Sequence, residues 1–234
     1  MIIEFWPMKQ LQKDFDVIAN FYQFELGNKI YQCRNHALIF RKGNSIQNEP
    51  DAVIVMANPG SCCPKDISYQ PPFLHDHFNH APYVEVKTDP TQLQLMRLMK
   101  IMNWNVISII NLSDLCAGNM GDFVKKLNLL EYHTFKEHSI FSETRTAERN
   151  TFLNGSKIKI IKAWGKNSNI RKLACEANEL LSKEIYGLPY DSPKWGFRHP
   201  FPMIKEKCLE WLEDMYQQLN YSDAQTEIAS SKYE

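Results

Sequence analysis

Two asparagines and a histidine are the side chains of this sequence with the strongest potential for hydrolytic chemistry. Asn58 ends the apolar run Val-Ile-Val-Met-Ala and precedes Pro-Gly, Asn111 ends the run Val-Ile-Ser-Ile-Ile, and His199 lies in Arg-His-Pro-Phe-Pro. An amide offers a donor and an acceptor together, so it can hydrogen-bond a ligand through both. A neutral imidazole offers one nitrogen as a donor and the other as an acceptor. Asparagines at strand ends are also common in plain turns, so both interpretations stay open at this point.

The elements that would position these side chains are strands alternating with helices after residue 50. The short apolar run at 51–57 is typical of a parallel strand covered on both faces, and 104–112 and 157–165 are predicted as two further buried strands. The alternation predicts an α/β fold of three layers, α/β/α, with a central and mostly parallel sheet. Ligands of such sheets bind at the carboxyl ends of the strands, which is where Asn58 and Asn111 lie.

We expect one domain over residues 1–218, with an N-terminal helix and hairpin in 1–49 and the main core in 50–218. Residues 219–234 are polar and are predicted to form a flexible tail. Within the first segment, apolar residues at helical spacing predict a helix over 9–27. The next stretch, 29–43, predicts two extended runs joined near Arg-Asn-His.

Further along the chain, Asp89 is expected to cap a helix that Pro90 begins. A loop rich in proline, histidine and aromatic residues is predicted over 61–87, and loops of that length are usually functional. The stretch 169–186 predicts an amphipathic helix, and 203–218 predicts the last helix.

Composition excludes several classes of protein. The 234 residues include 27 basic and 27 acidic side chains, a balance that disfavours a general nucleic-acid coat. No apolar run reaches the roughly 18 residues that span a bilayer, and the N-terminus lacks a signal-peptide pattern, so we expect a cytoplasmic protein. The 6 cysteines form no CxxC pair, which predicts reduced thiols rather than a zinc site.

The order of the short motifs resembles that of the uracil-DNA glycosylase superfamily: Asn-Pro-Gly at 58–60, Asn-Leu at 111–112, Trp-Gly-Lys at 164–166 and His-Pro-Phe-Pro at 199–202. The first motif is similar to that of the mismatch-specific thymine/uracil branch. The pattern also resembles an uncharacterised microbial domain family with Asn-Pro, Asp-Pro-Thr, Asn-Leu, Trp-Gly and Arg-His-Pro in this order. The resemblance covers roughly residues 50–205 and implies a glycosylase-like fold.

The resemblance implies a monofunctional DNA N-glycosylase without a cofactor or metal, acting in repair or in defence against modified viral DNA. Asn58 would hold the attacking water, His199 would donate to the pyrimidine carbonyl, and Asn111 would contact the base edge. Gly60 stands where strict uracil enzymes have a bulky ring, which predicts a pocket open to a 5-substituted pyrimidine. The alternative is that Gly60 serves the turn alone.

The remaining predicted contacts follow from the same resemblance and from composition. Ser61, Tyr69 and Phe73 complete the predicted base-binding set. DNA, the expected partner, would enter as a flipped nucleotide, and no obligate protein partner or membrane is expected. The predicted DNA-binding residues are Lys166, Asn167, Ser168, Lys194, Trp195, Arg198, Pro200 and Phe201. Two positions depart from the family pattern: Met56 replaces the usual glycine, and Phe201 replaces a small serine.

Three alternatives stay open. His75, His77 and His80 could form a metal site of a hydrolase, because histidines spaced in this way suit zinc. A non-catalytic module could keep the pocket to bind a nucleotide or a modified base, since Asn58 is not a carboxylate. An enzyme acting on free nucleosides or nucleotides would fit the neutral overall charge.

Overall fold

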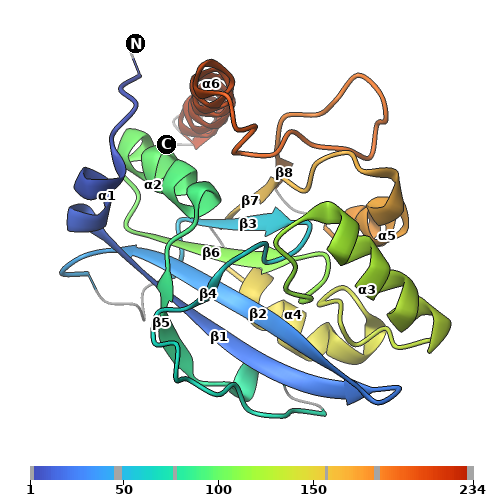
Figure 1. Ribbon diagram of the computed structural model, residues 1–234. Helices are drawn as coiled ribbons and strands as arrows, with labels where there is room; N and C mark the ends of the chain where they lie inside the picture. The colour runs from blue at the N-terminus through green and yellow to red at the C-terminus, as the bar shows by residue number, and fades with distance from the viewer. Residues whose placement is uncertain (1–2, 45–48, 76–77, 156–157, 182–184, 231–234) are drawn as a thin grey trace.

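The computed structural model describes residues 3–44, 49–75, 78–155, 158–181 and 185–230. Its described strands form an eight-stranded sheet in the order β4-β5-β1-β2-β6-β3-β7-β8 (Figure 1). The strands are β1 (Phe15–Leu26), β2 (Lys29–Arg41), β3 (Ala52–Met56), β4 (Cys63–Pro64), β5 (Tyr83–Lys87), β6 (Val106–Asn111), β7 (Lys159–Lys162) and β8 (Ile185–Tyr186).

The sheet is mixed, not mostly parallel. Strands β6, β3, β7 and β8 run parallel to one another. Strands β4, β5, β1 and β2 pair antiparallel, and β2 joins the two halves by an antiparallel pairing with β6. The prediction of an α/β fold is confirmed, and the predicted parallel character holds for the second half of the sheet.

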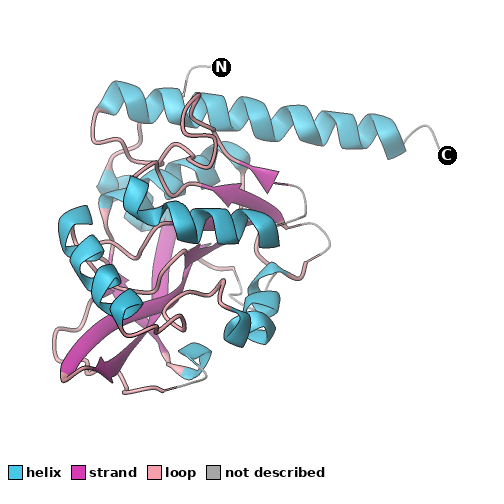
Figure 2. Ribbon diagram, turned by 90° about the vertical axis from the view of Figure 1, so that its right-hand side faces the viewer, coloured by secondary structure: helices cyan, strands magenta, loops and turns pink. Residues whose placement is uncertain are grey.

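Helices cover both faces of the sheet (Figures 1 and 2). The first core lies between the sheet and helices α1 (Met8–Asp14), α2 (Pro90–Met102) and α6 (Lys205–Ser230). The second core contains side chains of α3 (Met120–Tyr132) and α5 (Arg171–Leu180), and Phe152 of α4 (Thr146–Leu153) packs against it.

The predicted helix over 9–27 is wrong beyond Asp14, because the chain becomes strand β1 at Phe15. This strand is buried on both faces: Phe21 belongs to the first core, whereas Tyr22 belongs to the second. Apolar residues therefore occur on both sides of the strand, and the two-residue alternation expected of a half-buried strand is masked.

The hairpin turn also lies elsewhere than predicted. It is formed by Gly27 and Asn28, with φ of 57° and 59°, and not by the Arg-Asn-His run, which lies inside β2. Because β1 and β2 stand in the middle of the sheet, residues 15–41 are part of the main structure (Figure 1).

Other elements follow the local signals in part. Asp89 caps α2 as predicted: its side chain accepts from the Gln92 backbone N–H while the Gln92 side chain accepts from the Asp89 N–H. The predicted loop 61–87 contains β4, the short 3-10 helix Phe78–His80 and β5, and the predicted helix 169–186 ends in strand β8.

Helix α6 extends past its predicted end at 218 to Ser230 and lies along one edge of the molecule (Figure 2). The last four residues fall outside the described part of the chain. Among the described residues, no helix is both long and apolar enough to cross a membrane.

Candidate functional site

The two strand-end asparagines come together because β3 and β6 are parallel neighbours. Met56 pairs with Asn111 in the register of the two strands. Beyond the strands, the Leu112 N–H donates to the Met56 carbonyl at 2.7 Å, and the Ser113 N–H donates to the Ala57 carbonyl at 3.1 Å. The chain therefore leaves β3 into the Asn-Pro-Gly turn directly beside the end of β6.

Asn111 is fully buried and stabilises this turn. In the amide orientation that satisfies both contacts, its Nδ2 donates to the Asn58 carbonyl at 3.1 Å and its Oδ1 accepts from Arg34 Nη2 at 3.1 Å. The predicted contact of Asn111 with a base edge would have to replace these internal bonds, so its observed role is to position the main chain of Asn58.

Asn58 itself is half-buried at the turn. Its Nδ2 donates to the carbonyl of Ala117 at 3.0 Å. This bond orients the amide and ties the turn to the segment that follows β6.

An open cleft of about 470 Å³ lies beside this turn. Of the predicted site residues, Gly60 and Ser61 line it. Gly60 has φ of 66°, and a Cβ added there would meet no atom within 4 Å. Both interpretations of this glycine are therefore supported, because the backbone needs it and the space beside it is empty. The other residues lining the cleft are Gln32, Cys62, Cys116, Ala117, Gly118, Asp122, Lys125 and Lys126.

The cationic wall of the cleft was not predicted. Lys125 and Lys126 come from α3, and Lys126 Nζ donates to the Cys116 carbonyl at 2.6 Å. Asp122 adds one carboxylate, which accepts from the Asn119 side chain at 2.8 Å. The adjacent lysine pair was visible in the sequence, but nothing local placed it opposite the Asn-Pro-Gly turn.

His199 is related to the cleft only through the charge of Asp89 at the N-terminus of α2. Cys62, which lines the cleft, receives the Gln92 Nε2 at 3.3 Å. Gln92 and Asp89 form the cap of α2, and the Asp89 carboxylate opposes the lowering of the His199 pKa that burial causes. Of the three predicted residues, Asn58 and Asn111 are in direct contact, His199 hydrogen-bonds only to Phe201 among the described residues, and none of the three is among the residues that line the cleft.

The imidazole of His199 is suited to donate as a neutral group. Burial lowers its pKa below the ordinary value of 6.5, which outweighs the nearby Asp89 charge. Its Nδ1 lies 3.2 Å from both the N and the O of Phe201. Because the backbone N–H is always a donor, we assign Nδ1 as the acceptor, which leaves the hydrogen on Nε2.

The two predicted aromatic contacts lie outside the cleft lining. Tyr69 lines a separate hollow of about 350 Å³ with Val84 and Glu85. Phe73 is 53% exposed and bridges to Gln23 of β1, whose side chain donates to Gln32 in the cleft wall at 3.2 Å. Phe73 therefore does not reach the cleft itself, because Gln23 lies between it and Gln32.

Arg198 is engaged in ion pairs with α6. It contacts Asp214 at 2.6 Å and Glu210 at 3.1 Å, so its charge is compensated within the protein. Trp195 is half-buried, and its carbonyl accepts from Trp164 Nε1 at 2.9 Å. The side chains of Pro200 and Phe201 are buried and half-buried, respectively, while Lys194 is exposed.

The start of α5 also differs from the prediction. Asn167 caps the short 3-10 helix Ser168–Ile170, since its side chain accepts from the Asn169 N–H at 3.0 Å. Lys166 is exposed and lies over the ring of Tyr190, 4.5 Å from its centroid. Ser168, the first residue of this 3-10 helix, is also exposed.

The predicted metal site lies partly outside the described residues, since His77 belongs to 76–77. His75 and His80 are exposed. Among the described residues, no group of three histidine, cysteine or acidic side chains could hold a metal ion.

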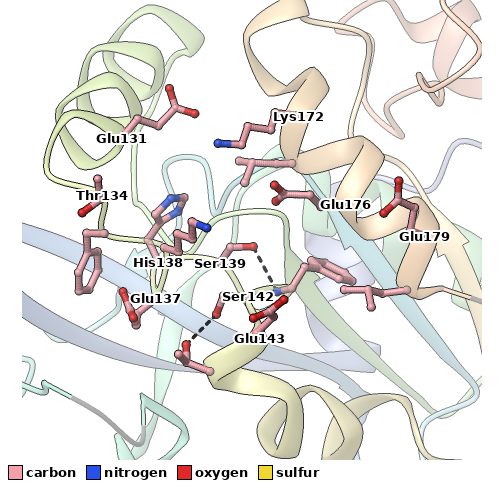
Figure 3. A pocket seen from close by; sticks show the side chains of 16 residues that line it. Glu131, Thr134, Glu137, His138, Ser139, Ser142, Glu143, Lys172, Glu176 and Glu179 are labelled. Carbon is pink, nitrogen blue, oxygen red and sulfur yellow. Dashed lines mark hydrogen bonds between the residues drawn. The ribbon is translucent and has the colours of Figure 1, made fainter.

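A second cavity, of about 460 Å³, opens between α5 and the segment after α3 (Figure 3). Its labelled side chains include the imidazole of His138, Lys172 and several glutamates. Five glutamates against two lysines line it, and that balance repels nucleic-acid phosphates. None of the residues predicted for the site lies there. The glutamates are Glu131, Glu137, Glu143, Glu176 and Glu179.

A buried polar network stabilises the segment after β6. The Arg145 guanidinium contacts Asp114 at 2.6 Å and Glu148 at 2.8 Å, and it donates to Asn35 at 2.7 Å. The hydroxyl of Tyr22 donates to Asp114 at 2.9 Å. Because Asp114 is fully buried, this network fixes the path of the chain between β6 and the cleft.

The assignment of this site depends on its own geometry. Comparison with known proteins found no family model, no curated protein and no solved structure that matches the chain. The function is inferred from the turn after β3, the cleft and the network that joins them.

Proposed function

We propose that the chain is a DNA glycosylase that hydrolyses the N-glycosidic bond of a pyrimidine carrying a substituent at C5. The observation that carries this proposal is the Asn58-Pro59-Gly60 turn beside a cleft of about 470 Å³ with open space at Gly60. A cleft of this size suits one nucleotide. The position at the carboxyl ends of parallel strands is the usual ligand site of such sheets.

A glycosylase-like fold of three layers is part of the same proposal. Helices on both faces of the sheet support it. The antiparallel β1–β2 hairpin would then be an addition that completes one wall through Gln32. The proposed setting is the cytoplasm, in repair or in defence against modified viral DNA, with DNA as partner and no obligate protein partner.

In the proposed reaction the nucleotide is flipped into the cleft. Asn58 orients a water at C1′ through its amide, and the bond between C1′ and N1 breaks with its electron pair moving to the base. The water oxygen then bonds to C1′ and releases one proton, and the base anion takes up one proton, so that the sugar gains OH and the base gains H. An amide is a weak general base, so stabilisation of the departing base must carry much of the rate.

His199 would supply part of that stabilisation by donating its Nε2 hydrogen to a pyrimidine carbonyl. Phosphate contacts are reassigned, since Arg198 is paired with α6. Lys125 and Lys126 line the cleft and take that role in the proposal.

Oligonucleotides that each carry one uracil, thymine or 5-hydroxymethyluracil test the activity, with alkaline cleavage revealing abasic sites. We expect cleavage at a 5-substituted base and a loss of about 100-fold or more in Asn58→Ala. Replacing Lys125 and Lys126 by alanine should lower the affinity for DNA and reduce its dependence on salt concentration. The control Lys207→Ala on α6 should leave both quantities unchanged. Absence of abasic sites from every DNA, single- or double-stranded, would refute the proposal.

A second candidate is a module that binds a modified base without catalysis. It is favoured by the Asn58 amide bond to Ala117 and by the engagement of the Asp122 carboxylate with Asn119. Binding of modified DNA by the wild type without release of a base would identify this function. If binding is retained and base release is lost in Asn58→Ala, the module is excluded.

A further inference from the structure

Arg34 is a buried cation directly behind the cleft. Its side chain is 2% exposed, and Nη2 donates to the Asn111 amide oxygen. Its Nε–H is buried and has no hydrogen-bond partner. Among the described residues, no carboxylate lies within the 4.0 Å of an ion pair with Arg34.

The other buried arginines are satisfied differently. Arg145 contacts two carboxylates. Arg97 donates to the Trp6 carbonyl at 3.0 Å, and Arg149 donates to backbone carbonyls at 3.1 Å and 3.3 Å. Arg34 differs from Arg97 and Arg149 in keeping a buried N–H without any acceptor, and a buried charge that is not compensated costs several kcal/mol, so the arrangement around Arg34 favours an anionic acceptor.

The cleft supplies the position for that anion. Cys62 and Cys116 line it. The Arg34 guanidinium lies near both thiols, and its charge acts on the pKa of each. Burial raises the pKa of Cys116 to about 12 and that of Cys62 less, and the Arg34 charge opposes both shifts. The two thiols are therefore neutral at pH 7 and do not compensate the cation.

We propose that Arg34 receives the negative charge of the pyrimidine anion as the base leaves. This inference rests on the proposed function and names the group that stabilises its leaving group. When the bond from C1′ to N1 breaks, the electron pair spreads from N1 onto the ring carbonyls. A carbonyl oxygen that enters from the cleft beside Cys62 can accept from the free Nε–H, in a buried site where such a contact is stronger than in water.

Binding of small probes tests this recognition without catalysis. Barbiturate is a pyrimidine that is anionic at pH 7, uracil is a neutral one, and inorganic phosphate is an anion without a ring. We expect wild-type protein to bind barbiturate at least about tenfold more tightly than uracil by calorimetry. Arg34→Met should abolish this preference, Arg34→Lys should keep part of it, and the buried control Arg97→Met should keep all of it.

Thermal unfolding without ligand separates this role from a structural one. Because an unpaired buried charge is removed, Arg34→Met should unfold at the wild-type temperature or higher. Retention of the barbiturate preference in Arg34→Met would overturn the inference. Stabilisation by inorganic phosphate but not by barbiturate would overturn it as well, since the site would then serve a phosphate.

Base release gives a readout that distinguishes failure of this inference from failure of the proposed function. Arg34→Met should slow excision about 100-fold, and more for thymine than for the better leaving group 5-fluorouracil. If the wild type releases both bases and Arg34→Met releases them at the same rates, the inference is overturned and the proposed function is retained. A third outcome is that the protein releases no base but prefers barbiturate in a way that requires Arg34. This outcome refutes the glycosylase function and supports anion recognition by Arg34.

Discussion

Replacing Gly60 by alanine and by tyrosine separates the backbone requirement of this glycine from the space beside it. At φ of 66° a side chain costs about 1–2 kcal/mol. For a chain of 234 residues this lowers the melting temperature by about 2–8 °C. We expect Gly60→Ala and Gly60→Tyr to lose similar stability, because nothing lies within 4 Å of the new Cβ and the ring extends into the cleft.

Gly43 is the matched control, since it has φ of 86° and equally empty surroundings at the end of β2. Gly43→Ala should lose as much stability as Gly60→Ala and leave ligand binding unchanged. The assay is thermal unfolding of the three variants, followed by binding and excision of 5-hydroxymethyluracil and uracil in DNA.

The tyrosine at position 60 should reduce recognition of the 5-substituted base by at least about tenfold more than that of uracil. Equal handling of both bases by Gly60→Ala and Gly60→Tyr would refute the assignment of this cleft as the base pocket. A melting temperature of Gly60→Ala far below that of Gly43→Ala would show that the space beside Gly60 is filled.

Three further predictions concern buried charges and histidines. Arg145→Met should lower the free energy of unfolding by about 3–5 kcal/mol in urea titrations, because Asp114 loses its buried partner, whereas Arg198→Met, with its more exposed ion pairs, should lose about 1 kcal/mol or less. Burial lowers the pKa of His36 to about 3, so below pH 6.5 the unfolded chain binds a proton that the folded chain excludes. Stability should therefore fall with decreasing pH, and His36→Gln should remove about 1.4 kcal/mol per pH unit of that slope between pH 4 and 6. Burial also lowers the pKa of His199, so the acid limb of base release should lie below pH 6.5 and be absent in His199→Gln; an unchanged limb would contradict its role as neutral donor.

Local signals were sufficient where an element is defined by its own residues. Asp89 and Pro90 predicted the start of α2, because a cap and a fixed φ act within one turn of helix. The apolar runs of β3 and β6 predicted buried strands, and the parallel arrangement brought Asn58 and Asn111 to one edge. The turn of the candidate site could be predicted for this reason.

Local signals failed where burial reverses the usual meaning of a residue type. Arg34, Asn35 and His36 are consecutive polar residues and predicted a turn, yet they are 2%, 0% and 4% exposed in the middle of β2. Their partners come from distant segments: Asn111 for Arg34, Arg145 for Asn35 and a serine of β6 for His36.

The amino-acid order alone determined the alternating elements, the asparagine in the turn after β3 and the glycine in the same turn. Long-range packing determined which polar groups are available to a ligand. It paired Arg198 with the carboxylates of α6, whereas it left the Nε–H of Arg34 without a partner behind the cleft. The physical reason is that a charge is compensated by whatever lies within a few ångströms of it, and those neighbours are set by the tertiary contacts of the whole chain.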